Sequence, residues 1–130
     1  MPIILHISGD IIERQELLNG TRTVTLEGTT ADGDWVLTGV VSWNLGLVDY
    51  PGEGDLTLSR GDDEIFATLV RAVPRAADDE QAEVILDAEY AIDGAAGAFL
   101  GASGRVTAQI SLTREQFQSR WELPLSLDKT

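Results

Sequence analysis

Aromatic side chains are the residues of this chain whose types best suit chemistry on a small molecule. The 130 residues include three Trp, two Tyr and three Phe. Aromatic rings can line an apolar pocket, and indole N–H and phenol O–H groups can hydrogen-bond a bound carbonyl. The candidate substrate-binding aromatics are Trp35, Trp43, Tyr50, Phe66, Tyr90 and Trp121. Packing of the same rings in a hydrophobic core is the competing interpretation, and it stays open.

Acid–base and metal chemistry find weaker support in the sequence. Asp87 and Glu89 are two residues apart and could divide acid and base roles, but they alternate with apolar residues, so a solvated outer strand face is favoured. His6 is the only histidine and there is no Cys, so no zinc or other transition-metal site is expected. No nucleophile elbow or calcium-loop spacing is present. Catalytic residues therefore stay unassigned, and we expect no cofactor.

The charge of the chain limits its partners. With 22 acidic and 9 basic side chains the formal net charge is −13, which argues against binding nucleic acid or an anionic membrane surface. The hydrophobic share of 43% supports a real core, and the length fits one domain over residues 1–130. No basic leader begins the sequence and no apolar run approaches the roughly 20 residues that span a bilayer, so we expect a cytoplasmic protein.

Alternation of apolar and polar residues indicates a sheet along most of the chain. Residues 82–92 and 105–112 alternate cleanly, and about eight such runs, counting Pro2–Ser8, follow one another through short turns. This pattern predicts an all-β fold, an antiparallel barrel of about eight strands that is closed like a calycin. Asp10 with Glu13 resembles a capping box, and Asn19-Gly20 would end a helix, so one short N-terminal helix is also predicted.

Smaller features refine this barrel. Asp32-Gly33 predicts a two-residue hairpin turn with positive φ at both positions. Arg71 shares a strand face with Leu69 and two earlier apolar residues, which predicts a guanidinium at the barrel mouth, within reach of water or of a ligand's acidic group. Trp35 and Trp43 are eight residues apart, which is about 26 Å along a straight strand, so they cannot share one small ligand unless the strand bends.

A glycine-rich segment between two strands carries the most specific signal for the fold. Four glycines and one aromatic residue, Phe99, lie within residues 94–104. Glycine is used where the backbone needs positive φ or a close approach. Phe99 is therefore predicted to hold this turn onto the core as a plug.

The glycine segment also resembles a known group of barrels. Residues 90–107 are similar to the G-x-x-G-x-(aromatic)-x-G-x-x-G segment of the allene oxide cyclase-like barrels, which include dirigent proteins and the bacterial spirotetronate cyclases. Residues 31–43 and 54–65 resemble hairpins of the same barrels, so the likeness covers roughly residues 21–112. The resemblance implies isomerases, polyketide cyclases or guides of radical coupling, with aromatic residues in the barrel.

Three functions follow as expectations. The first is a cofactor-independent cyclase or isomerase, of pericyclic or Diels–Alder type, that orients a polyketide-like or other hydrophobic small molecule in the barrel. The second is a barrel that binds such a molecule without converting it. The third is a barrel filled by its own side chains that acts as an interaction module or oligomer subunit. The partner expected is thus a hydrophobic small molecule, and a homodimer stays open.

Overall fold

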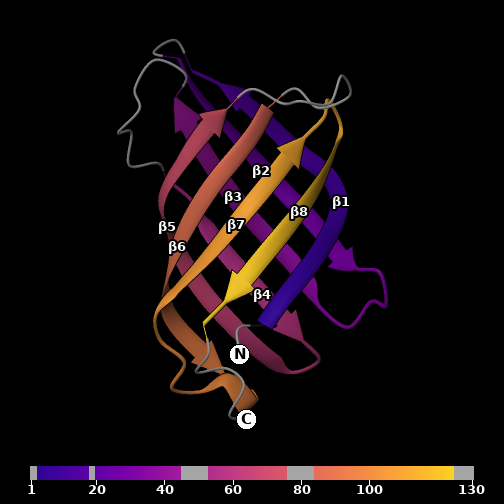
Figure 1. Ribbon diagram of the computed structural model, residues 1–130, viewed down its shortest axis with the longest axis vertical. Coiled ribbons are helices and arrows are strands. Elements are labelled where there is room, and N and C mark those ends of the chain that lie inside the picture. The colour runs from indigo at the N-terminus through magenta and orange to yellow at the C-terminus, as the bar shows by residue number, and fades with distance from the viewer. Residues whose placement is uncertain (1–2, 18–19, 45–52, 76–83, 125–130) are drawn as a thin grey trace.

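Eight antiparallel strands form a closed barrel in this computed structural model. The structure describes residues 3–17, 20–44, 53–75 and 84–124. Each strand pairs with its neighbour in sequence, and β8 pairs with β1 (Figure 1). The strands are β1 (Ile3–Glu16), β2 (Thr21–Thr30), β3 (Val36–Asn44), β4 (Asp55–Arg60), β5 (Asp63–Arg75), β6 (Val84–Ala96), β7 (Arg105–Leu112) and β8 (Gln116–Leu123). The predicted all-β closed antiparallel barrel is confirmed.

The predicted N-terminal helix is wrong, because the residues assigned to it belong to β1. Asp10 pairs with Glu27 of β2 and with Gln116 of β8, so the chain is extended where the capping box was expected. A register shift between Ile11 and Glu13 marks a β-bulge, which explains why two isoleucines stand side by side in a strand. The backbone pairing of β1 with β2 outweighs the local preference of the capping-box residues for a helix. In the described residues the one helical element is a short 3-10 turn, η1 (Gly97–Phe99).

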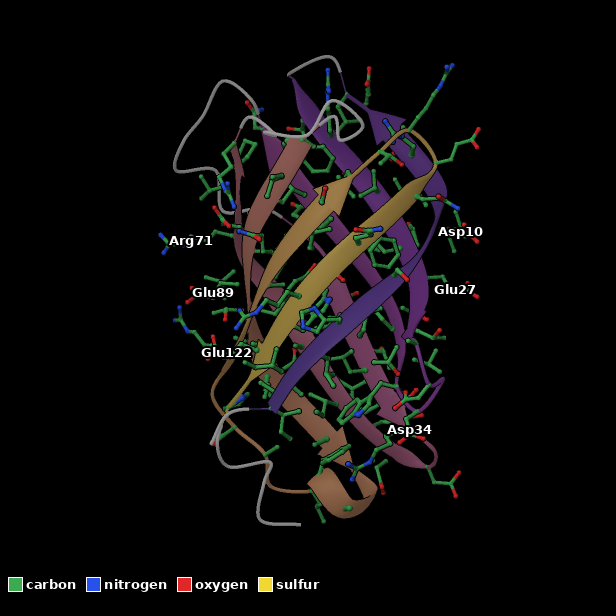
Figure 2. The ribbon with its side chains drawn as sticks, turned by 45° about the vertical axis from the view of Figure 1, so that its right-hand side comes forward. Asp10, Glu27, Asp34, Arg71, Glu89 and Glu122 are labelled. Atoms are coloured by element: carbon green, nitrogen blue, oxygen red, sulfur yellow. The ribbon has the colours of Figure 1, made fainter. Side chains whose placement is uncertain are left out.

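The alternate residues of each strand fill the barrel interior. Large side chains that are almost completely buried come from strands all around the barrel. They include Ile7, Leu26, Leu37, Leu56, Leu58, Ile65, Leu86, Tyr90, Ile110, Phe117 and Trp121. Charged residues such as Asp10, Glu27 and Glu89 project from the outside of the barrel (Figure 2). Burial of this apolar surface is the main stabilising contribution to the fold.

One end of the barrel, here named the plug end, is closed by η1 and drawn at the bottom of Figure 1. The ring of Phe99 is buried and stacks on Trp35, with centroids 5.5 Å apart and an interplanar angle of 20°. The guanidinium of Arg60 lies 4.9 Å from the Phe99 centroid and 5.2 Å from that of Trp35. Such cation–π contacts add to the apolar packing. The prediction that Phe99 plugs the core is confirmed.

Glycine is required in the plug at Gly97. Its φ is +70°, and a Cβ there would lie 2.2 Å from Oδ1 of Asp63. The same carboxylate oxygen accepts a hydrogen bond from the backbone N–H of Ala98 at 2.8 Å. Asp63 therefore ties η1 to the start of β5, and the absence of a side chain at Gly97 lets it approach.

The turn between β2 and β3 differs from the expected two-residue hairpin. Gly33 has a φ of +77°, but Asp32 does not have a positive φ, and five residues separate the two strands. The carboxylate of Asp32 accepts hydrogen bonds from the Thr30 hydroxyl at 2.6 Å and from the Asp34 N–H at 3.0 Å. These bonds lower the pKa of Asp32 below its usual value. The longer turn brings Trp35 over the plug end.

Replacement of Phe99 tests the plug. Phe99→Ala should lower the free energy of unfolding by about 3 kcal/mol, because it removes a buried ring that Trp35 and Arg60 contact. Leu100→Ala is the matched control, since Leu100 is 78% exposed and should change the free energy by less than about 0.5 kcal/mol. Denaturant unfolding measures both, and equal effects of the two variants would contradict the assignment of Phe99 as the plug.

Candidate functional site

The structure divides the predicted pocket residues among three locations. Trp43, Tyr90 and Trp121 lie inside the barrel, and Trp35 belongs to the plug. Phe66 is on the outer face of β5 and is 37% exposed. Tyr50 lies outside the described residues. The interior aromatics therefore define the candidate site, away from the plug.

Arg71 does not share the inward face of β5 with Leu69, so the prediction of its face is wrong. The register between β5 and β6 shifts between Leu69 and Arg71, which marks a second β-bulge. A bulge inserts one residue and reverses the alternation beyond it. Ala72 consequently points inward and is buried, while the Arg71 side chain is 65% exposed and projects outward (Figure 2).

Tyr90 crosses the barrel interior. It extends from β6, and its hydroxyl donates a hydrogen bond to the carbonyl oxygen of Val40 on β3 at 3.0 Å. Because β3 and β6 are not neighbouring strands, the phenol side chain must reach across the core. Burial raises the pKa of Tyr90, and the nearby carboxylate of Asp55 raises it further. The Tyr90 hydroxyl is thus a neutral donor whose proton is already hydrogen-bonded to the Val40 carbonyl.

Trp121 lies beside Tyr90, with the ring centroids 5.8 Å apart. Its indole N–H donates a hydrogen bond to the hydroxyl of Ser119 at 2.7 Å, and that hydroxyl donates to the carbonyl of Ile7 at 2.8 Å. The three strands that precede β8 carry small inward residues at a row of paired positions that ends at Trp121. Ala72 pairs with Ala88, Ala88 with Ala108, and Ala108 with Trp121. These alanines leave room for the large indole.

Trp43 is the unusual member of the group. Its side chain is buried, with 3% of its surface exposed, and its indole Nε1 has no hydrogen-bond partner. It is the one buried side-chain nitrogen or oxygen atom in the described residues that lacks a partner. A buried donor without an acceptor is rare in native structures, because it costs about 1–3 kcal/mol. Trp43 therefore carries a buried donor that no described residue satisfies.

The position of Trp43 in the barrel wall supports this role. The ladder between β3 and β4 extends from Val36 to Gly39, and β3 then continues to Asn44 beyond the start of β4. Trp43 lies on this continuation, near the end of the barrel opposite the plug, which is drawn at the top of Figure 1. We name this the far end. The site thus comprises Trp43 at the far end, with Tyr90 and Trp121 deeper inside.

The carboxylates of β6 lie on the outside of the barrel, as predicted. Asp87 accepts a hydrogen bond from Arg75 at 3.0 Å, and Glu89 accepts one from Arg105 at 2.7 Å. A hollow of about 370 Å³ on the outside of β5–β8 is lined by Arg71, Val73, Asp87, Ala88, Glu89, Thr107, Ala108, Gln109 and Arg120. Its charges are mixed in sign and exposed, so it resembles a solvated surface rather than an acid–base site.

The part of the chain that the structure describes has neither a cluster of metal ligands nor a helix that could span a membrane. No three His, Asp or Glu side chains there lie close enough together to hold a metal ion. None of the helical structure within the same residues is long and apolar enough to cross a bilayer.

Comparisons with known proteins give no match. Neither the protein-family models, nor the curated proteins, nor the solved structures contain one that is similar to this chain at a significant level.

Sequence reasoning named Trp43, Tyr90 and Trp121 but did not separate their roles. Which indole N–H is paired depends on contacts between distant strands, such as that between Ser119 and Trp121, and periodicity carries no signal for it. The three alanines could have been noticed, because small residues interrupt the apolar faces of three consecutive strands. Three small inward residues at paired positions predict that a large side chain, or a ligand, fills the barrel interior beside them.

The bond from Tyr90 predicts an alkaline instability. Because burial raises the pKa of Tyr90, the unfolded chain loses the phenol proton first as the pH rises past about 10. The folded state then binds more protons, so the contribution of Tyr90 to stability is complete below about pH 10 and is lost above it.

Tyr90→Phe provides the measurement. The free energy of unfolding of the variant should be about 1 kcal/mol lower than that of the wild type at neutral pH. Above pH 10, the free energy of unfolding should fall less steeply in the variant than in the wild type. Tyr50→Phe is the control that removes the other tyrosine, and it should retain the steep fall. Identical alkaline profiles for the wild type and Tyr90→Phe would contradict the assignment.

Proposed function

We propose that the protein binds an apolar small molecule inside the barrel, at the far end beside Trp43. The unpaired Nε1 of Trp43 is the observation that carries this proposal. Other buried donors, including Tyr90 and the Trp121 indole, already have acceptors. An acceptor atom on a ligand would remove the cost of burying the Trp43 donor alone, so binding would gain the hydrogen bond as well as apolar contact.

The surroundings of Trp43 favour an apolar ligand. Inward residues towards this end include Val41 of β3 itself, Val24 of β2 and Ala72 of β5, all of them buried and apolar. Ligand pockets are mostly apolar, with a few polar groups that fix orientation. One N–H donor in an apolar lining matches this description.

Conversion of the bound molecule is a second candidate function. The free N–H of Trp43 is the observation that favours it, because a donor fixed in an apolar site can polarise a carbonyl. Orientation of a flexible chain can lower a barrier by several kcal/mol without a catalytic acid or base. The resemblance of the glycine segment to the allene oxide cyclase-like barrels supports the same idea. The reaction would be a cofactor-independent cyclisation or isomerisation.

Binding can be tested with Nile red, a neutral dye that fluoresces in apolar surroundings. The wild type should bind it saturably, with one dye per barrel. Ala72→Met fills the interior from β5 and should weaken binding at least about tenfold, since overpacking competes with the ligand for space. Ala91→Met, on the outer face of β6, is the matched control and should bind as the wild type does.

Two outcomes would reject binding inside the barrel. The first is the absence of saturable binding to the folded wild-type protein, which would favour a barrel filled by its own side chains. The second is an equal effect of Ala72→Met and Ala91→Met, which would place the dye outside. Circular dichroism establishes that both variants fold.

Conversion can be tested with a linear trienone in which a diene and an enone are joined by a short alkyl chain. Intramolecular cycloaddition forms two carbon–carbon bonds at the expense of two π bonds, and no atom leaves. The protein should accelerate ring formation, and Trp43→Phe should slow it toward the rate in buffer because the polarising donor is lost. A trienone that binds but reacts no faster than in buffer would reject catalysis of this reaction and leave binding intact.

A further inference from the structure

We infer that the ligand is a neutral molecule that presents a carbonyl oxygen to Nε1 of Trp43, and that Trp43 selects it against hydrocarbons, alcohols and carboxylates. The inference rests on the proposed binding function and names the chemical class of the ligand. It follows from the polar groups that the barrel offers, and from those that are already occupied.

A ligand that carries an acceptor atom suits the unpaired donor of Trp43. Within the described residues, Nε1 of Trp43 is the sole buried side-chain polar atom without a partner, and it can only donate. A hydrocarbon leaves that donor unpaired, so it gains apolar contact alone. A ligand with an acceptor at this position gains the bond as well, which makes Trp43 a determinant of specificity.

A carbonyl and a hydroxyl on the ligand differ in the hydrogen bonds that they require of the barrel. A carbonyl oxygen accepts the N–H of Trp43 and needs nothing further. A ligand hydroxyl can accept the same bond, but its own proton then needs an acceptor. In the described residues, no buried side-chain acceptor lacks a hydrogen-bond partner. The hydroxyl of Ser119 and the backbone carbonyl of Val40 already accept bonds from Trp121 and Tyr90. The alcohol therefore carries a desolvation cost that the ketone does not.

A negative charge on the ligand would be unfavourable inside the barrel. The buried residues that the structure describes include no Lys, Arg or His. Arg22 is the residue paired with Trp43 across β2 and β3, and its guanidinium lies 3.6 Å from the Glu16 carboxylate. The chain as a whole carries a net charge of −13. A carboxylate would lose its hydration without gaining an unoccupied cation, and the field of the protein would oppose its approach.

A matched series of naphthalenes tests this chemistry. Acetylnaphthalene and ethylnaphthalene differ by a carbonyl in place of a methylene, hydroxyethylnaphthalene supplies the alcohol, and naphthoate supplies the carboxylate. The wild type should bind the ketone about tenfold more tightly than the ethyl compound, which is the contribution of one buried hydrogen bond. The alcohol and the naphthoate should bind more weakly than the ketone.

Substitution of Trp43 separates the hydrogen bond from the apolar contact. In Trp43→Phe the ratio of the ketone and ethyl affinities should fall to about one, because both compounds then meet an apolar ring. Trp35→Phe makes the same substitution in the plug and should retain the ratio. In the wild type, the indole N–H resonance of Trp43 should move downfield with acetylnaphthalene and not with ethylnaphthalene, a readout that needs no variant of the barrel.

The outcomes distinguish the inference from the function on which it rests. If the ketone and the ethyl compound bind equally, or if Trp43→Phe leaves their ratio unchanged, carbonyl selection is wrong while apolar binding stands. Tighter binding of the naphthoate or of the alcohol would likewise overturn the inference. If none of the four compounds binds saturably, and Nile red does not bind either, the proposed function fails.

Discussion

Closure of the sheet by the ladder between β1 and β8 is the constraint on which the rest of the structure depends. Pairing from Ile3 with Leu123 to Asp10 with Gln116 joins the first strand to the last and removes the open sheet edges along that length. Once the ring is closed, alternate residues must face a single interior. Tyr90 can then span that interior to Val40, and Ser119 can link the Trp121 indole to the backbone of β1.

The two ends of the barrel differ in how their polar groups are satisfied. At the plug end, Asp63 holds the backbone of η1, and Arg60 lies over Phe99 and Trp35. At the far end, β3 extends beyond its ladder with β4, and the indole of Trp43 lacks an acceptor. The plug end thus uses its aromatic residues for stability. The contrast in hydrogen bonding directs the argument for ligand binding to the far end.

Period-two alternation was sufficient to predict the closed barrel, and the glycine segment was sufficient to predict Phe99 as its plug. The errors in strand faces arise at bulges. The register shift near Ile11 breaks the alternation that is typical of a strand, so the local capping pattern wrongly predicts a helix there. The shift near Arg71 reversed the inward face of β5. Bulges depend on pairing with a partner strand, which one segment of sequence does not encode. The same limit applies to Trp43, whose free donor is defined by what distant strands fail to supply.

The central claim is that Trp43 carries a buried indole N–H without an acceptor in the ligand-free protein. A nitrogen–proton correlation spectrum of that protein resolves the indole groups of its three tryptophans, and Trp-to-Phe variants assign them. The account predicts a downfield, hydrogen-bonded proton for Trp121 and an upfield proton for Trp43 that exchanges slowly with solvent because it is buried. A downfield Trp43 proton in the absence of any ligand would show that the donor is already paired, and would contradict the account.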